Sequence, residues 1–241
     1  MPVKMKGYIV LFLTMFPILA AQAQYNDFVL GFKAGAAYSG ISNLENMIVP
    51  EDYFETDAYS FVTHDNYGAV AGAFIHFRVL ETFLSVQPEV TYSTQGATLS
   101  YHDNMDYAYD IRFKYQYVNV ALFFKTDYKG VSLRAGPRLG FAVNPAAVKF
   151  SSNNRAYGED NDIEQGFKNV LKGRTDFNIG AGLAYESKFG FGLEAMYFFG
   201  VGDVIETLTN SYDFIENTNR SRSIQLTLTY TLDLRGDGKK R

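Results

Sequence analysis

Charged side chains at alternating positions are the residues of this chain whose types and spacing could do chemistry. Nine of them fall inside segments in which apolar and polar residues alternate: Lys33, Arg78, Glu89, Lys125, Arg134, Arg138, Asp176, Glu186 and Glu194. Five are basic and four are acidic. Because an unpaired charge is costly in a low-dielectric interior, this near balance predicts a network of ion pairs. The chemistry expected of the set is therefore structural.

One loop holds a second group of possible ligands, the carboxylates of Glu159, Asp160, Asp162 and Glu164. Carboxylate oxygens are ligands for hard cations such as Ca²⁺, but these four lack the spacing of an EF-hand. A solvated acidic loop is favoured over a specific cation site, which we keep as the alternative.

Catalysis and cofactor binding have little support in the sequence. The chain has three histidines and no cysteine, and only His76 falls in an alternating segment, where a polar interior residue is the ordinary interpretation. The glycines do not form a G-x-G-x-x-G motif between a strand and a helix. We expect no enzyme, no cofactor and no transition-metal site.

The elements that would position these side chains are β-strands. From Arg222 to Leu234, even positions are apolar or Tyr and odd positions are polar, a period of two. Seven further segments alternate in the same way, at roughly 27–39, 67–79, 83–96, 113–126, 131–143, 174–187 and 190–202. Soluble strands typically have roughly 5–6 residues, whereas a tilted membrane span needs about 9–11, so these long segments are typical of a membrane barrel.

The connections between these segments alternate in length. The short ones cover 80–82, 127–130 and 188–189, and the long ones cover about 40–66, 97–112, 144–173 and 203–221. In an up-and-down meander, all long loops then emerge at one end and all tight turns at the other. The pattern predicts an eight-stranded antiparallel up-and-down transmembrane β-barrel of the outer-membrane type.

The soluble alternative is an eight-stranded barrel of the lipocalin kind, and the two differ in which face points inward. The polar parity mixes glycine with long charged side chains, which suits a cramped interior in which side chains interleave. The apolar parity, as in 118–124 and 191–199, ends in aromatic residues of the kind found at membrane interfaces. The membrane barrel is therefore favoured.

Two prolines conflict with this pattern. In Phe83–Ser93, Pro88 falls on the lipid-facing parity and Glu89 on the lumenal one, where Arg or Lys can pair with it. A closed barrel has no edge strand to accommodate a missing N–H, so we expect a bulge or a local break in the ladder at Pro88 and at Pro137.

The first residues indicate export. Lys4 and Lys6 precede an apolar run from 7 to 19 and then Ala21-Gln22-Ala23, which is the pattern of a secretory signal peptide. We expect residues 1–23 to be removed, residues 24–234 to form the barrel, and residues 235–241 to form a short polar tail. The alternative is an uncleaved membrane anchor.

Acidic residues gather at the predicted loop end, since the four long loops hold 17 acidic and 6 basic residues. The first loop adds apolar residues between Met47 and Phe61, a surface suited to docking another protein. The partners expected are outer-membrane lipid and lipopolysaccharide, with divalent cations bridging acidic loops to its phosphates, and envelope proteins bound by the outer loops. No nucleic acid is expected.

Several short motifs resemble the PorT-like outer-membrane β-barrel family of Bacteroidota, often labelled porin family. They begin at Gly31, Leu84, Tyr117, Arg134 and Asn178 and read GFKAG, LSVQPE, YVNV, RAGPRLG and NIGAGL. The resemblance implies an eight-stranded outer-membrane barrel in a family whose members mostly lack an assigned activity. One branch works in type IX secretion and gliding. The last strand departs from proteobacterial barrels, because it ends in Leu-Asp-Leu and not in an aromatic residue.

Three functions stay open on the sequence alone. An eight-stranded lumen is just wide enough to be filled by side chains, which favours a structural or interaction role in the cell envelope. The alternatives are a porin for small solutes or ions and a component of a type IX secretion and gliding machinery.

Overall fold

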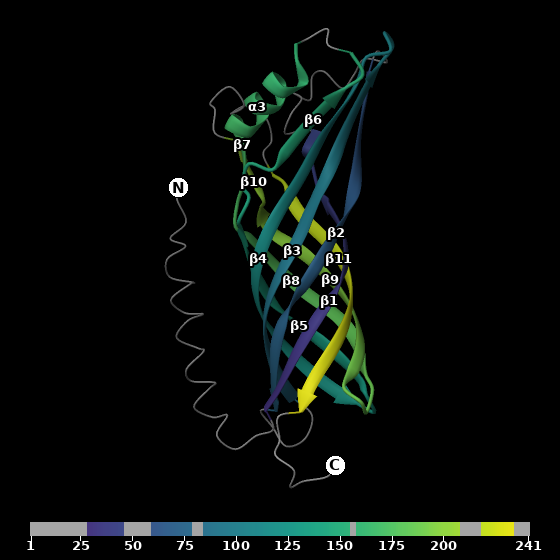
Figure 1. The fold of residues 1–241 in the computed structure, drawn as a ribbon, viewed down its shortest axis with the longest axis vertical. Coiled ribbons are helices and arrows are strands. Elements are labelled where there is room, and N and C mark those ends of the chain that lie inside the picture. Colours follow the sequence, from purple (N-terminus) through teal and green to yellow (C-terminus); the bar gives the residue numbers. More distant parts are fainter. Residues whose placement is uncertain (1–27, 46–58, 79–83, 155–157, 208–217, 234–241) are drawn as a thin grey trace.

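The computed structural model describes residues 28–45, 59–78, 84–154, 158–207 and 218–233 (Figure 1). The predicted signal segment 1–23, the predicted tail 235–241 and residues 46–58 of the first long loop lie outside the described residues.

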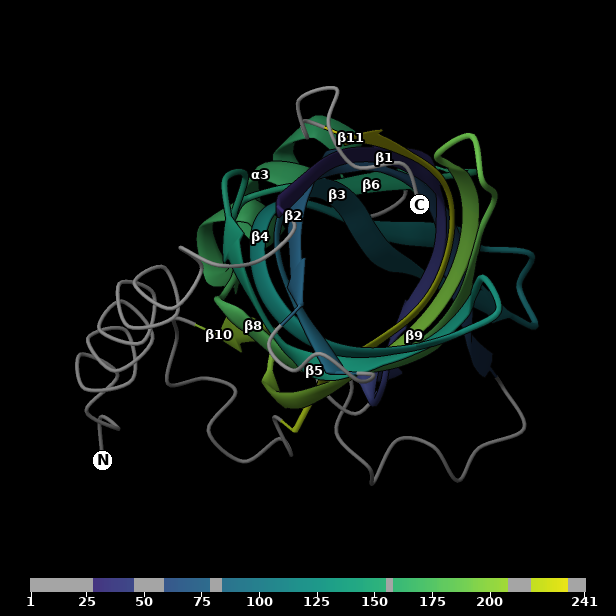
Figure 2. The ribbon, with the colours of Figure 1, turned by 90° about the horizontal axis from the view of Figure 1, so that it is seen from below.

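Eight strands form a closed antiparallel ring, seen along its axis in Figure 2. They are β1 Phe28–Ile41, β2 Tyr59–Arg78, β3 Leu84–Asp103, β4 Ala108–Tyr128, β5 Val131–Ala142, β8 Asp176–Glu186, β9 Phe191–Asp203 and β11 Arg220–Asp233. Each pairs with its neighbours along the chain, and β1 pairs with β11 to close the ring. The predicted eight-stranded up-and-down barrel is confirmed.

The two faces of each strand differ as the alternation predicts. On β11, Ser223, Gln225 and Thr227 are buried in the interior, whereas Leu226 and Leu228 are exposed on the outer wall. Because the sheet is closed, one parity of each strand faces the lumen and the other faces outward; the inward parity is largely polar but also buries apolar side chains such as Phe74, Phe123 and Phe198. The outer wall is therefore the apolar surface that a lipid bilayer requires.

Proline interrupts two ladders without moving the register. Pairing between β2 and β3 skips Pro88 and its neighbour Gln87 and then resumes in the same register. Pairing between β4 and β5 skips Pro137 and Gly136 in the same way. Of the two outcomes expected from the sequence, the structure has the local break and not the bulge.

The lipid-facing expectation for the stretch around Pro88 needs one correction. Val90 and Tyr92 are exposed, but Val86 and Pro88 are buried although they share the outward parity. Val86 lies between Phe77 and Phe124 in the register, so two larger side chains flank it on the same face.

Strands β2, β3 and β4 have 20, 20 and 21 residues and extend well beyond the rim of the barrel (Figure 1). The predicted loop 97–112 is mostly a paired hairpin, in which Tyr101 lies opposite Tyr109. The expectation of a loop was wrong here because the inward parity continues with apolar residues, including Leu99 and Phe113, that have a core to enter.

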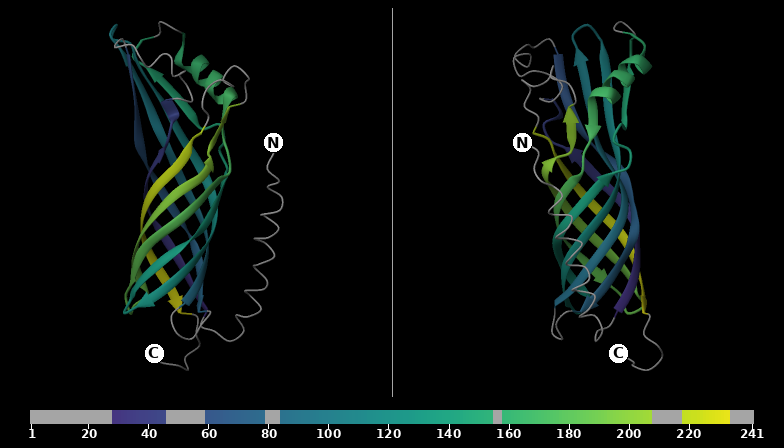
Figure 3. Two further views of the ribbon diagram at one scale, coloured as in Figure 1. Left: turned by 180° about the vertical axis from the view of Figure 1, so that it is seen from behind. Right: turned by 90° about the vertical axis from the view of Figure 1, so that its left-hand side faces the viewer.

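The third and fourth long connections also carry regular structure (Figure 3). β6 (Val148–Ser152) pairs with β4, helix α3 (Asp160–Val170) follows, and β7 (Leu171–Gly173) pairs with β10 (Ile205–Thr207). We call these elements, with the extensions of β2 to β4, the outer cap. Among the helices in the described part of the chain, none has the length and apolar composition of a membrane span.

Replacing Leu226 with Arg tests which face meets lipid. Leu226 is 56% exposed near the middle of β11. A cation at the bilayer midplane should reduce the free energy of unfolding by about 2–4 kcal/mol, measured by urea titration of the protein in lipid vesicles. Asn104→Arg, in the exposed turn of the cap, is the charge-matched control and should have little effect. Equal losses in both variants would contradict a lipid-facing β11.

Candidate functional site

Four charged side chains from four strands meet in the middle of the lumen: Lys33 on β1, Glu89 on β3, Arg134 on β5 and Glu194 on β9. Lys33 Nζ lies 2.6 Å from Glu89 Oε2 and 2.6 Å from Glu194 Oε1. Arg134 pairs with Glu194, and its Nη1 lies 3.9 Å from Glu89 Oε1. All four residues are at most 5% exposed. Two cations and two anions form a neutral group, which we call the lumenal quartet.

Glycine opposite each cation gives the quartet its room. Gly72 lies directly across the ladder from Lys33, and Gly182 lies across from Arg134. A Cβ added at Gly72 would lie 2.3 Å from the carbonyl oxygen of Val90, and one at Gly182 would lie 2.1 Å from that of Ala195. These glycines therefore allow close approach of neighbouring backbones while long side chains fill the lumen.

A second polar group surrounds Arg138. Its Nε donates to Asn178 Oδ1 at 2.9 Å, and Asn178 Nδ2 donates to Asp176 Oδ1 at 2.6 Å. Ser221 Oγ donates to the same carboxylate at 2.9 Å. The guanidinium carbon of Arg138 lies 3.7 Å from the centre of the Phe198 ring, a cation–π contact. Arg138 thus reaches Asp176 through an amide, an intermediary that charge counting did not reveal.

Lys125 forms a third group toward the turn end, 3.0 Å from Asp127 Oδ1 and 3.7 Å from Glu186 Oε2. The structure thus distributes eight of the nine residues singled out from the sequence among three groups, and the side chain of Arg78 lies outside the described residues. Asp127 was missed because it falls in a predicted turn.

On the loop side of these ions, the inward face becomes apolar. A buried cluster there combines residues of β1, β3 and β4 with residues of the cap. Its members are Ile41, Leu44, Ala97, Leu99, Ile111, Phe113, Tyr115, Tyr117, Val148, Phe150, Leu171, Val204 and Ile205. Ions therefore occupy the middle of the lumen, and an apolar core occupies its outer end.

A model of the outer membrane protein beta-barrel domain family matches residues 20–206, most of the chain. The chain belongs to this family. Membership in this family places the chain in the outer membrane, with the apolar wall of the ring facing lipid. A search of curated proteins finds no match.

Several solved outer-membrane structures are similar in outline. Neisserial surface protein A has 13% identity and a TM-score of 0.37, covering 84% of this chain and 96% of its own. Ail of Yersinia pestis, solved with the heparin analogue sucrose octasulfate, has 16% identity and a TM-score of 0.40, covering 86% and 99%. OprG of Pseudomonas aeruginosa has 10% identity and a TM-score of 0.41, covering 88% and 98%.

The acidic loop of this outer-membrane β-barrel serves a structural purpose in the cap. Asp160 accepts hydrogen bonds from the Ser152 backbone N–H at 3.1 Å and from its hydroxyl. Glu164, one helical turn later, accepts from the Phe150 N–H at 3.2 Å and pairs with Lys168. Two carboxylates on one face of α3 thereby attach the helix to β6.

The structure does not assemble the four loop acids into a cation site. Two of them bind β6, and Asp162 is exposed. Across the described ranges, no group of three or more His, Cys, Asp or Glu side chains could hold a metal ion.

Removing one anion of the lumenal quartet should be costly. Glu194→Leu leaves Lys33 and Arg134 to share Glu89 alone, so we expect the free energy of unfolding in vesicles to fall by about 3–5 kcal/mol. Adding Lys33→Met restores neutrality and should recover part of this loss. Glu206→Gln, on the exposed cap, is the control. Full stability of the single variant would show that the quartet contributes nothing.

Attachment of α3 should weaken in acid. The hydrogen bond from Lys168 holds the pKa of Glu164 below its usual value, so this stabilisation is complete above the unfolded-state pKa. It is lost as pH falls through the lower pKa of the folded state. The α3 amides should therefore be less protected from hydrogen exchange at pH 3 than at pH 7, with protection measured against an unstructured reference peptide at each pH. The variant Glu164→Gln should show a smaller difference between the two pH values. An unchanged pH response in that variant would contradict this role.

Proposed function

We propose that this outer-membrane β-barrel is a closed, non-conducting barrel that presents a folded cap for interaction in the cell envelope. The observation that carries the proposal is the filling of the lumen by the neutral quartet, with the apolar cluster beyond it.

The geometry favours this role over a porin for small solutes or ions. A ring of eight strands encloses a space that side chains alone can fill. A conducting path would have to separate Lys33 and Arg134 from Glu89 and Glu194, exposing buried charges that currently satisfy one another. A role carried by the outer surface does not require these ion pairs to separate.

The cap is the part of the molecule best suited to recognition. It is a folded unit with its own apolar core, so its surface has a defined shape and binding would cost little ordering entropy. Its tip carries the exposed Met105, in the turn between β3 and β4. We include the PorT-like resemblance in this proposal, with a role in a secretion and gliding machinery as one form that such an interaction could take.

Conductance measurements test the closed lumen. The purified protein, refolded in lipid vesicles and fused from them into planar bilayers, should show no steady resolvable current steps. Heat-modifiable gel mobility of protein recovered from the same vesicles should verify that the barrel is folded. Steady conductance would contradict the proposal and support the porin alternative.

Site-specific crosslinking tests the cap as the interacting end. A photoreactive residue at Met105, 86% exposed, is compared with one at Phe189, 84% exposed in the turn between β8 and β9 at the opposite end. We expect a discrete envelope-protein adduct in living cells from position 105 and none from position 189. Adducts from position 189 alone would contradict the assignment to the cap.

A further inference from the structure

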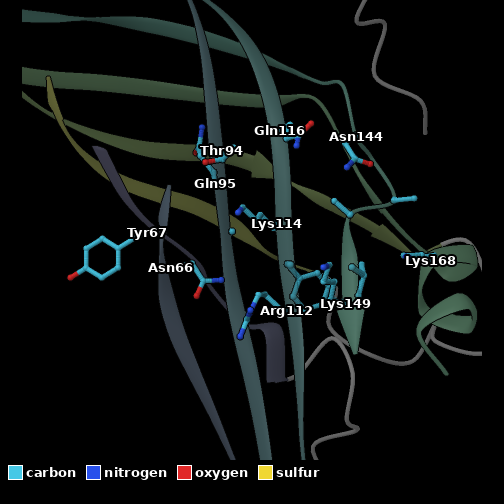
Figure 4. Close-up of a pocket in the computed structure, with 15 residues that line it drawn as sticks. Asn66, Tyr67, Thr94, Gln95, Arg112, Lys114, Gln116, Asn144, Lys149 and Lys168 are labelled. Atoms are coloured by element: carbon cyan, nitrogen blue, oxygen red, sulfur yellow. The ribbon is translucent and has the colours of Figure 1, made fainter. Parts of the chain in front are cut away.

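A hollow of about 620 Å³ lies in the wall of the barrel where it meets the cap (Figure 4). Its polar lining comes from β2, β3, β4, the connection to β6, β6 itself and α3. The four basic lining residues are Arg112, Lys114, Lys149 and Lys168. Among the described residues that line it, none is Asp or Glu. We call this feature the basic groove.

The groove coincides with an irregularity in the sheet. Pairing between β2 and β3 shifts register between Asp65 and Val70. Side-chain hydroxyls replace the missing backbone partners, since the Ala69 N–H donates to Thr94 Oγ1 at 2.8 Å and the Gly96 N–H donates to Ser39 Oγ at 2.9 Å. The ladder is therefore open at this point, and polar atoms line the opening.

The basic residues of the groove lie close enough to repel one another. Arg112 on β4 and Lys149 on β6 are direct cross-strand partners, and Lys114 follows Arg112 on the same face. Like charges in directly opposite positions destabilise a sheet. Within the described ranges, none of these three makes an ion pair, whereas Lys168 pairs with Glu164. Glu164, which pairs with Lys168, also attracts Lys149 electrostatically and offsets part of this repulsion. An anion bound in the groove would offset the rest.

The groove lies at the edge of the lipid-facing band. The outward parity of β4 is apolar from Leu122 to Val118 and changes to Gln116, Lys114 and Arg112 beyond it. At roughly 3.3 Å per residue, Lys114 lies about 13 Å further along the tilted strand than Val118. Tyr67, another lining residue, is 82% exposed, as expected of an aromatic side chain at a membrane interface. The basic groove is therefore at the level of lipid headgroups.

We propose that the basic groove binds the phosphate groups of an outer-leaflet lipid. Arg112 can grip a phosphate in a bidentate manner, and Lys149 and Lys114 supply further positive charge. Amide donors from Asn66 and Asn144 also line the groove. A lipid phosphate would neutralise the repulsion between Arg112 and Lys149 while its acyl chains stay against the apolar wall. This contact is direct and requires no divalent cation, unlike bridging through acidic loops.

Binding is measured with two lipids that differ only in phosphate. The purified barrel in detergent is titrated with bisphosphorylated lipid A and with its dephosphorylated form, and binding is followed by native mass spectrometry. We expect clear preference for the phosphorylated lipid, unaffected by EDTA. The variant Arg112→Gln/Lys149→Gln should lower that affinity at least tenfold.

The control variant is Lys129→Gln/Lys188→Gln, which removes two exposed lysines from the turns at the opposite end and should leave the affinity unchanged. A stability readout separates binding from folding. Without lipid, Arg112→Gln/Lys149→Gln should have a thermal stability close to that of the parent chain, because it removes the repulsion between Arg112 and Lys149 together with the attraction of Lys149 to Glu164. With phosphorylated lipid, only the parent and the control should gain thermal stability.

Four results would overturn the proposal. Equal binding of both lipids would show that phosphate is not recognised, and equal losses in the control variant would assign the effect to net charge. Loss of binding in EDTA would indicate cation bridging instead. Full competition by free pyrophosphate, with no preference between the lipids, would identify a site for soluble anions. The proposal depends on the membrane location of the groove and not on whether the lumen conducts.

Discussion

Closure of the sheet between β1 and β11 is the constraint on which the rest of the structure depends. The register runs without interruption from Val29 opposite Asp233 to Ile41 opposite Ser221. In lipid, a backbone group without a partner has no water to bond with, so a spanning sheet must have no edge. Closing eight strands leaves a narrow interior, and every inward side chain must then be small or must find a partner within it.

The lumenal quartet follows from that narrow interior. Its four residues come from β1, β3, β5 and β9, which alternate with other strands around the ring, so the ion pairs join strands that share no backbone ladder. The ions therefore brace the barrel across its lumen, while hydrogen bonds hold it around its circumference. The same contacts occupy the path that a solute would need, so stabilisation and closure of the lumen have one physical origin.

The cap extends the same logic beyond the membrane. Beyond the lipid, the inward-facing positions of β3 and β4 carry apolar side chains in place of paired charges. Leu99, Ile111 and Phe113 form an apolar core there with Phe150 of β6. Asp160 and Glu164 then hold α3 against that strand. The wall is least regular where barrel and cap meet, and the basic groove lies there.

The sequence by itself determined the number of barrel strands, their order, the direction of most faces and the positions, Pro88 and Pro137, at which a ladder is disturbed. These features depend on local alternation and on missing N–H groups, which one segment reveals alone. Only the tertiary structure decided which charges meet, because Lys33 and Glu194 lie 161 residues apart and parity specifies a face but no partner. It also decided that the long connections fold and that Arg112 lies opposite Lys149, since pairing between β4 and β6 depends on a register that neither strand encodes alone.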